Sequence, residues 1–487
     1  MSAASLLVAS NRGPVSFRQD DSGVLTAHRG GGGLVSGLSL VGRGSDVLWV
    51  CAALSDADRA AARLAPGGRI DRTGEDHAGH DAVDAPVRML DIDPLTFARA
   101  YNAVANSTLW FVHHQLYATA LQPSFDTAFG LQWSSYADYN RAFAEALAAD
   151  AAVGARVVIQ DYHLVLAPRM LRELRPDLRI GHFSHTPWAP VDYYRMLPSG
   201  VAAQVLEGVL GADHAGFLSP RWADAFLDCC AQVLDAEVDR EARTVRHAGR
   251  LTRVAVHALG VDGPDLRRRA AQPDVESRLA TLLDQVGDCK VLVRVDRTEL
   301  SKNIVRGLHS YRELLRRRPQ WRGRVVHVAG AYPSRHDLPE YREYTAAVQR
   351  VGSEINEEFG SAAWQPLILH VNDDYARSLA SMRMADVLLV NPVRDGMNLV
   401  AKEGPVLSER SAVLVLSTEA GAAEELGAHA LLVNPYDVSG TADALHAALS
   451  MPADDRNRRA SALAAAATAL PPGRWFAEQL AALESGP

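Results

Sequence analysis

Several features that often reveal a protein's class are missing from this sequence. Its four cysteines form no CxxC pair and have no metal-ligand spacing, so buried or free thiols are expected instead of a disulfide framework or a metal site. It contains neither a GxGxxG dinucleotide fingerprint nor a Walker phosphate loop, which counts against a nucleotide-binding oxidoreductase. No apolar run approaches the ~18 residues of a membrane span, and the apolar start is too short for a signal peptide. We therefore expect a cytoplasmic protein.

The sequence also lacks a strong excess of charge of either sign. Fifty Lys and Arg against 58 Asp and Glu give a formal charge of −8, which gives no general attraction to nucleic acid or to an anionic membrane. Any phosphate group must therefore be bound by a local cluster of cations. The 487 residues are too many for one ordinary core, and two domains of about 200–250 residues are expected.

Short apolar runs alternate along the chain with amphipathic helical patterns. This alternation predicts an α/β fold with doubly wound parallel sheets, whose faces are covered by helices. The expected strands are residues 5–10, 47–54, 157–160, 179–185, 254–259, 291–295, 325–330, 367–371, 387–391, 412–417 and 431–435. One of these predicted helices has an apolar face made of Ile304, Leu308, Tyr311 and Leu315. Two such domains facing each other would bring the carboxyl ends of both sheets to one cleft.

The stretch 262–277 is the best candidate for a linker, because it has an arginine run, two prolines and no helical periodicity. It predicts a boundary near residue 260, with one domain at 1–260 and a second at 261–470. The segment that begins at Arg474 has the pattern of a short amphipathic helix. We expect residues 471–487 to pack back on the first domain.

Cationic side chains follow three of the predicted strands. Arg297 and Lys302 lie in the segment RVDRTELSKNI, between a strand and a helix. Arg335 follows the strand at 325–330, and Arg12 follows the first strand. Cations beside a helix start suit a diphosphate, although any one segment alone is as typical of a solvated basic loop. The glycine run RGGGGLVSGL at 29–38 is a weaker indication, because such runs are more often merely flexible.

The segment NPVRDGMNLVAKEG at 391–404 is the most unusual in the chain. It passes from an apolar strand through Asp395 into a helix with Asn398 near its start. The backbone N–H groups of 397–400 could bind a phosphate or a sugar hydroxyl, while Asp395 and Glu403 could accept hydrogen bonds from a hexose and a ribose. The plainer interpretation makes Asp395 a helix cap and Glu403 a surface charge.

Polar and aromatic residues of the first half complete the candidate site. Asp161 and His185 each end a predicted strand, and Tyr101 and Trp110 offer flat faces and hydrogen-bonding groups suited to a sugar. Taken singly, the aromatics are more often ordinary core residues, and His185 is more often a structural histidine than a catalytic one.

Together these segments resemble glycosyltransferase family 20, the family of the trehalose-6-phosphate synthases. The resemblance runs through SNRGP, GGGLVSGL, LWFVHH, QDYH, SHTPW, SRHDLPEY, RDGMNLVAKE and LSTEAGAAEEL, so it covers nearly the whole chain. It implies a GT-B fold, with two Rossmann-like domains and the active site between them. It also implies transfer of glucose from a nucleotide-diphosphate glucose to glucose 6-phosphate, giving α,α-trehalose 6-phosphate. No cofactor or metal is expected, and a homo-oligomer is left open.

The resemblance further implies roles for individual residues. The acceptor would be bound by Arg12, Tyr101, Trp110, Asp161 and Arg335. The donor diphosphate would be bound by the backbone of Gly33, the cations Arg297 and Lys302, and the helix start at Asn398, Leu399 and Val400. The transferred glucose would contact His185 and Asp395, and the ribose would contact Glu403. Catalysis would depend on His185, Asp395, Arg297 and Lys302.

This chain departs from the usual family text in two places. It reads RTELSKN from Arg297 where RLDYSKG is usual, and KEGPV from Lys402 where KEYVA is usual. The departures resemble a branch that includes pseudo-glycosyltransferases, which couple a cyclitol nucleotide to an aminocyclitol phosphate. That function is one alternative, and a non-catalytic GT-B protein that senses sugar phosphates is another. Because His185, Asp395 and the diphosphate cations are all present, a true glucosyltransferase is favoured.

Family membership implies retention at the anomeric carbon without a covalent sugar–enzyme intermediate. We expect a front-face displacement, in which the departing diphosphate is stabilised by cations and takes the acceptor's proton. For the donor base, Asp373 and Asp374 could accept from guanine N1–H and its amine, whereas uracil has one such donor. Surface charge is the commoner interpretation of either aspartate. The resemblance to the divergent branch nevertheless slightly favours GDP-glucose over UDP-glucose.

Overall fold

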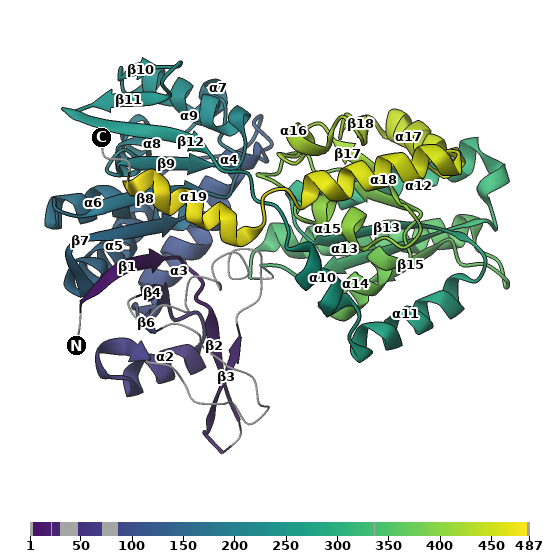
Figure 1. The fold of residues 1–487 in the computed structure, drawn as a ribbon, viewed down its shortest axis with the longest axis horizontal. Coiled ribbons are helices and arrows are strands. Elements are labelled where there is room, and N and C mark those ends of the chain that lie inside the picture. Colours follow the sequence, from purple (N-terminus) through teal and green to yellow (C-terminus); the bar gives the residue numbers. More distant parts are fainter. Residues whose placement is uncertain (1–2, 21, 30–46, 71–85, 336, 485–487) are drawn as a thin grey trace. The chain divides into compact units, whose positions relative to one another are not determined.

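The computed structural model describes residues 3–20, 22–29, 47–70, 86–335 and 337–484. The chain divides into two compact units, which are Met1–Ala258 with Pro472–Pro487 (unit 1) and Leu259–Pro471 (unit 2). Each unit contains one parallel-rich sheet with helices packed on it (Figure 1). The α/β architecture predicted from the sequence is therefore confirmed.

The sheet of unit 1 is built around parallel strands. Its strands are β1 (Ala4–Ala9), β4 (Val47–Ala52), β5 (Arg69–Ile70), β6 (Val87–Leu90), β7 (Ala151–Gln160), β8 (Arg179–Ser184), β9 (His214–Phe217), β10 (Glu237–Asp239), β11 (Thr244–His247) and β12 (Arg250–Val256). They lie in the order β10-β11-β12-β9-β8-β7-β1-β4-β6-β5, and from β12 to β6 all neighbours are parallel. From β1 the chain moves outward through β4, and from β7 it moves outward on the other side. A separate hairpin joins β2 (Val15–Gln19) to β3 (Leu25–Arg29).

The helices of unit 1 include a distorted segment and one helix contributed from the far end of the sequence. They are α2 (Asp56–Leu64), η2 (Pro66–Gly68), α3 (Pro94–Ala98), the π-helix η3 (Arg99–Leu109), α4 (Trp110–His114), α5 (Thr127–Asp150), η4 (Tyr162–Leu164), α6 (Ala167–Leu174), α7 (Val191–Tyr194), α8 (Ser199–Val209), α9 (Pro220–Val233) and α19 (Pro472–Glu484). Helix α19 packs on β8 and β9. Its Trp475 is fully buried and donates from Nε1 to the carbonyl of His257 at 3.1 Å.

The sheet of unit 2 is parallel throughout. Its strands are β13 (Lys290–Arg297), β14 (Val325–Tyr332), β15 (Leu367–His370), β16 (Val387–Val390), β17 (Val413–Ser417) and β18 (Leu431–Val433), in the order β15-β14-β13-β16-β17-β18. Counted from the first strand of the unit, this is 3-2-1-4-5-6, the order of the dinucleotide-binding Rossmann fold. Every strand range predicted from the sequence overlaps a strand of one of the two sheets.

The helices of unit 2 correct one prediction. They are α10 (Gly263–Ala270), α11 (Pro273–Val286), η5 (Leu300–Lys302), α12 (Ile304–Arg317), η6 (Pro319–Trp321), α13 (Pro339–Phe359), α14 (Tyr375–Arg383), α15 (Val400–Leu407), α16 (Ala423–Leu426), α17 (Val438–Ser450) and α18 (Ala453–Ala467). The expected linker at 262–277 was wrong, because it forms α10 and the start of α11. Asp262 caps α10 by accepting from the N–H of Asp265 at 2.9 Å, and both prolines lie in first turns, where they need no N–H partner.

The predicted apolar face of α12 is confirmed. Ile304, Leu308, Tyr311 and Leu315 are each fully buried, in the same core as Leu292 of β13. Across the described parts of both units, every helix is too short or too polar to span a bilayer.

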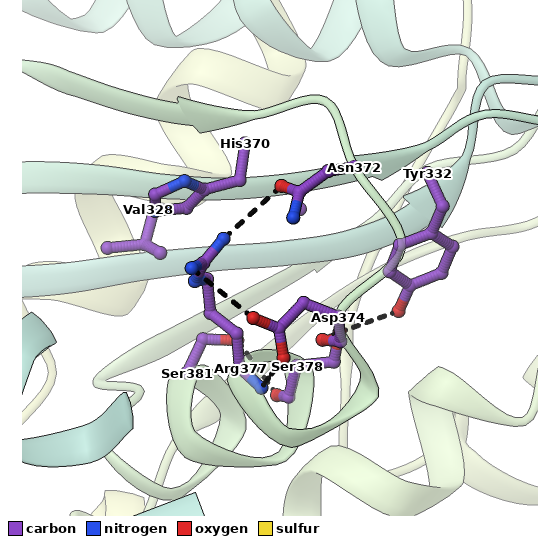
Figure 2. A pocket seen from close by; sticks show the side chains of 9 residues that line it. Val328, Tyr332, His370, Asn372, Asp374, Arg377, Ser378 and Ser381 are labelled. Carbon is purple, nitrogen blue, oxygen red and sulfur yellow. Dashed lines mark hydrogen bonds and ion pairs between the residues drawn. The ribbon is translucent and has the colours of Figure 1, made fainter. Parts of the chain in front are cut away.

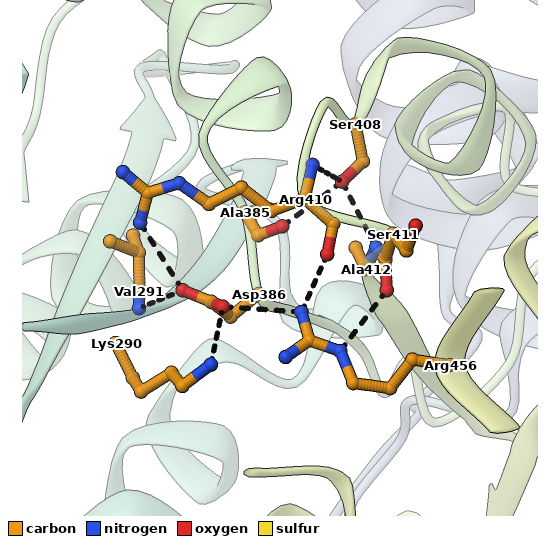
Figure 3. A network of polar contacts seen from close by, with 9 residues as sticks. All are labelled: Lys290, Val291, Ala385, Asp386, Ser408, Arg410, Ser411, Ala412 and Arg456. Atoms are coloured by element: carbon orange, nitrogen blue, oxygen red, sulfur yellow. Dashed lines mark hydrogen bonds and ion pairs between the residues drawn. The ribbon is translucent and has the colours of Figure 1, made fainter. Parts of the chain in front are cut away.

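A single carboxylate ties together the amino-terminal end of the unit 2 sheet. Asp386 precedes β16 and accepts from the N–H of Val291 on β13 at 2.9 Å. Three cations surround it: Lys290 at 3.0 Å, Arg456 of α18 at 3.2 Å and Arg410 at 3.3 Å. Figure 3 shows how these side chains converge on the two oxygens. This network lies at the end of β13 opposite to the predicted site residues.

Candidate active site

Several of the predicted site residues follow strands at which the order of each sheet changes direction. In doubly wound sheets, the loops diverge at this switch point beyond the carboxyl ends of the strands and leave a place for a ligand. In unit 1 the switch lies between β1 and β7, which are followed by Arg12 and Asp161. In unit 2 it lies between β13, which ends at Arg297, and β16, which leads to Asp395. Each unit thus has its own candidate edge for a ligand.

Lys302 and Asp395 form the centre of the site in unit 2. The Nζ atom of Lys302 donates to Oδ2 of Asp395 at 2.5 Å, and Asn398 Nδ2 donates to the same oxygen at 3.0 Å. Both charged side chains are only 13% exposed. Burial lowers the pKa of Lys302, but the negative charges of Asp395 and Glu299 outweigh it and leave this pKa above its ordinary value. The lysine is therefore cationic at neutral pH.

The start of α15 lies beside this ion pair. Asn398 has φ of 78°, and its Oδ1 accepts from the N–H of Ala401 at 3.1 Å, so it is Asn398 that caps this turn and Asp395 that pairs with the lysine. Among the described residues, the N–H groups of Leu399 and Val400 find no acceptor. Such donors at a helix start are suited to a phosphate oxygen.

Glu403 lies in the first turn of α15. Its carboxyl forms no hydrogen bond with the residues that the structure describes, and burial raises its pKa to about 7. The pKa of Tyr332 is raised mainly by its own burial, with a contribution from the negative charge of Glu403.

Sequence reasoning missed Glu299, which is fully buried between two predicted cations. Arg297 Nη1 lies 3.1 Å from Glu299 Oε1, while half of the arginine side chain is exposed. Arg335 Nη1 lies 4.0 Å from the same oxygen and donates to the hydroxyl of Tyr341 at 2.7 Å. The sequence signal that could have identified Glu299 is its place between Arg297 and Lys302 in the segment RTELSK.

In unit 1, Asp161 and His185 lie together at the ends of β7 and β8. The N–H of His185 donates to Asp161 Oδ1 at 3.1 Å, and its Nε2 lies 2.8 Å from Gln160 Oε1. Burial lowers the pKa of His185 to about 3, and nearby His182 contributes. The ring is therefore neutral at physiological pH. With its proton on Nε2, its Nδ1 can accept a hydrogen bond.

The other residues of unit 1 that are predicted to bind the acceptor lie in different surroundings. Tyr101 on η3 stacks between Phe97 and His163, with ring centroids 5.2 and 5.6 Å away. Trp110 is 7% exposed and stacks on His114 at 3.8 Å. Arg12 is exposed after β1. Gly33, the predicted donor glycine, lies outside the described residues.

A small hollow lies at the ends of β14 and β15 in unit 2 (Figure 2). Its lining includes Val328, Gly330, Tyr332, His370, Asn372, Asp374, Arg377, Ser378 and Ser381. Asp374 Oδ1 caps α14 by accepting from the N–H of Arg377 at 2.9 Å. Its Oδ2 lies 2.9 Å from Arg278 and 3.2 Å from the Arg377 guanidinium. Both carboxylate oxygens of Asp374 therefore have partners within unit 2. Asp373 is exposed.

Known proteins match this sequence over nearly the whole chain. The sequence model of glycosyltransferase family 20 matches residues 4–485. A trehalose-6-phosphate synthase from Mycobacterium avium is 34% identical over 494 residues, with 99% of this chain and 96% of the relative covered. A probable α,α-trehalose-phosphate synthase (UDP-forming) from Arabidopsis thaliana is 33% identical over 461 residues, covering 93% of this chain. The chain spans 54% of that plant protein, about half its length.

Solved structures match equally far. An E. coli structure described as bound with UDP-2-fluoro glucose has a TM-score of 0.83 and 27% identity, with 99% of each chain covered. A UDP-forming α,α-trehalose-phosphate synthase from Burkholderia xenovorans, in complex with glucose-6-phosphate, has a TM-score of 0.84 and 25% identity over 99% of this chain and 100% of that one. The protein therefore has the GT-B fold of nucleotide-sugar glycosyltransferases. The chain belongs to glycosyltransferase family 20.

Proposed function

We propose that this protein is an α,α-trehalose-phosphate synthase, which transfers glucose from a nucleotide-diphosphate glucose to glucose 6-phosphate. The observation that carries the proposal is the cluster of Lys302, Asp395 and Asn398 at the switch point of unit 2, next to N–H groups at the start of α15 that have no acceptor among the described residues. Family membership supports the reaction class. The ligands named for the E. coli and Burkholderia structures support the two substrate classes.

In this proposal the second domain, residues 261–470, binds the nucleotide sugar. Lys302, Arg297 and the start of α15 at Asn398, Leu399 and Val400 bind the diphosphate, together with the backbone of Gly33 from the first domain. Asp395 binds a hydroxyl of the transferred glucose, and Glu403 accepts from the ribose. The first domain, residues 1–260 with the helix at 471–487, binds most of the acceptor. Its acceptor residues are Arg12, Tyr101, Trp110 and Asp161, to which the second domain adds Arg335.

The mechanism that fits these groups is a front-face displacement. As the bond from the anomeric carbon to the diphosphate breaks, negative charge grows on the leaving oxygen, where Lys302 and the α15 donors stabilise it. The acceptor hydroxyl attacks from the same face and passes its proton to the departing diphosphate. Asp395 already pairs with Lys302, so it orients the sugar instead of attacking it. His185 is neutral and accepts from a glucose hydroxyl through Nδ1.

Two residues of the family departures, Asn303 and Pro405, lie beside these groups in the chain. Asn303, which stands where the family usually has glycine, adopts φ of 57°, a conformation that asparagine tolerates better than most residues. Its Nδ2 donates to the carbonyls of Asn391 and Pro435 at 2.9 and 2.7 Å. Pro405 lies inside α15, beyond the turn that carries Glu403. These substitutions are the reason for keeping the pseudo-glycosyltransferase as the second candidate.

Two donor bases fit the proposal. Asp373 supports guanine, because an exposed carboxylate can accept from N1–H and the exocyclic amine together. The names of the plant and Burkholderia relatives, which are UDP-forming, support uracil. We keep GDP-glucose slightly ahead for this chain. Equal concentrations of both donors in one assay decide the matter, and a strong preference for UDP-glucose would end the guanine proposal.

The direct test of the function is a product assay. The protein is incubated with glucose 6-phosphate and each nucleotide-glucose, and the mixture is analysed by mass spectrometry for a phosphorylated disaccharide. Formation of trehalose phosphate with the α,α linkage supports the proposal. Turnover of a cyclitol nucleotide alone would favour the pseudo-glycosyltransferase, and binding of glucose 6-phosphate without turnover of any donor would favour the sensor.

Glu403 gives the proposal a pH dependence. Ribose hydroxyls donate to the ionised carboxylate, so KM for the donor is expected to fall as pH rises through about 7, the pKa of Glu403. Glu403→Gln should remove this dependence, which a series of KM measurements from pH 5.5 to 8.5 would reveal. A variant that keeps the wild-type pH profile would contradict the assignment.

The same pKa predicts a change in the stability of the ligand-free protein. A carboxyl whose pKa is higher in the folded state favours folding most below pH 4.5 and loses that contribution as pH rises through 7. Relative to wild type, Glu403→Gln should gain at most about 3 kcal/mol between pH 4.5 and 8. Urea unfolding at the two pH values measures this difference.

A further inference from the structure

Glu299 joins loops that follow two neighbouring strands of unit 2. It lies between β13 and η5, and its side chain is fully buried. Its Oε1 lies 3.1 Å from Arg297 Nη1 and 4.0 Å from Arg335 Nη1. Ser334 Oγ donates to the same oxygen at 2.9 Å. Arg297 ends β13, whereas Ser334 and Arg335 follow β14, so one carboxylate oxygen links both strand ends.

The backbone fixes this carboxylate at the strand ends. Thr298, which precedes Glu299, donates to the carbonyl of Tyr332 from its N–H at 2.7 Å and from Oγ1 at 3.0 Å. The N–H of Lys302 donates to the carbonyl of Glu299 at 3.0 Å. The position of the Glu299 backbone is therefore set by β14 on one side and by η5 on the other.

The charges around Glu299 keep it ionised. Burial raises the pKa of its carboxyl, but Arg297, Arg335 and Lys302 together lower it to about 2. The guanidinium groups of Arg297 and Arg335 would repel each other without an anion between them. Glu299 Oε2 is buried and accepts no hydrogen bond from the described residues. The carboxylate is thus held mainly by its cations and by Ser334.

We propose that Glu299 is a positioning residue that fixes Arg297 and Arg335 for the binding of a diphosphate and of a phosphate monoester. The inference rests on the proposed function, which assigns Arg297 to the donor and Arg335 to the acceptor. Glu299 acts through the two arginines and contacts neither substrate. One buried negative charge therefore serves both binding steps, and its loss should weaken both.

The competing interpretation predicts the opposite sign. If Glu299 only competed with phosphate for the arginines, its neutralisation would leave more positive charge and tighten anion binding. If it positions them, neutralisation frees two flexible side chains that must then be ordered by the ligand, and binding weakens. The direction of the change in affinity therefore separates the two roles.

The test measures anion binding by the full-length chain in the absence of turnover. Inorganic pyrophosphate and inorganic phosphate are titrated separately by calorimetry into wild type, Glu299→Gln and the control Glu357→Gln, whose glutamate is exposed on α13. We expect Glu299→Gln to lower the affinity for both anions at least 10-fold. The control variant should bind both anions with affinities within twofold of those of wild type. Glu299→Asp, which retains the charge, should recover part of both affinities.

A second variant separates the two arginines and keeps the inference testable if Glu299→Gln does not fold. Tyr341→Phe removes only the hydroxyl that accepts from Arg335. This variant should lower the affinity for phosphate several-fold and leave the affinity for pyrophosphate unchanged.

Unchanged or tighter binding of either anion by Glu299→Gln would overturn the inference. The inference would also be overturned if Tyr341→Phe lost equal affinity for both anions, or if the wild-type protein bound neither of them. Absence of a disaccharide product in the separate activity assay would instead overturn the proposed function.

Discussion

Lys302→Ala is expected to lower kcat by about 10²–10³-fold, the loss seen when one buried donor to a developing oxyanion is removed. Lys302 is 13% exposed and cationic, and it lies where the resemblance to family 20 places the donor diphosphate. In the proposed mechanism, its charge stabilises the leaving group more strongly as the bond breaks than in the ground state. The effect should therefore appear in kcat as well as in kcat/KM.

The control for this variant is Lys290→Ala. Lys290 belongs to the same sheet but lies at its opposite end, beside Asp386. Its loss should leave kcat within about twofold, because removal of a half-exposed ion pair changes stability by no more than about 1 kcal/mol. Steady-state kinetics with saturating donor compare the two. An unchanged turnover rate in Lys302→Ala would refute the role given to this lysine.

Asp386→Ala is expected to lower the free energy of unfolding by about 3 kcal/mol, the lower end of the range for breaking a buried ion pair. The change leaves Arg456 and Arg410 without their carboxylate and leaves the N–H of Val291 without its acceptor. Urea unfolding monitored by circular dichroism measures the effect. Asp284→Ala, at an exposed position of α11, should change stability by less than about 0.5 kcal/mol.

The effect of Asp386 should depend on pH in a defined direction. Burial raises the pKa of this carboxyl, but the N–H of Val291 and the cations Lys290 and Arg410 lower it below 3.8. Its contribution to stability is present above pH 3.8 and is lost as the pH falls through the pKa of the folded state. The difference in the free energy of unfolding between wild type and Asp386→Ala should therefore become smaller from pH 7 to pH 3. If this difference in free energy stayed constant with pH, the lost stability would come from packing and not from the charge of Asp386.

The strands could be predicted from the sequence because buried parallel strands are short and apolar on both faces. The stretch 262–277 was misinterpreted because the same residues signal both a break and a helix start. Pro273 and Asp262 interrupt a helix when they stand in its interior, yet they favour its first turn. Periodicity over such short helices is too weak to decide between the two. The hairpin of β2 and β3 was missed because its strands are largely exposed and polar.

For the candidate site, the sequence predicted which residues lie at the strand ends but not how they pair. The contact of Lys302 with Asp395 spans 93 positions and follows from the adjacency of β13 and β16. The contact of Glu299 with Arg335 likewise requires β14 to lie beside β13. For Asp374, the local hydrogen bond with the N–H of Arg377 was likewise not predicted from the sequence.

Helix α19 has a consequence for how the chain acquires its structure during synthesis. The face of β8 and β9 that it covers is made before residue 258, whereas Trp475 is made only after all of unit 2. A ribosome-bound chain can thus complete unit 2, which is continuous in sequence, while unit 1 still lacks its last buried tryptophan. Nascent unit 1 would expose an apolar surface for as long as some 200 residues take to translate, at about 5–20 residues per second.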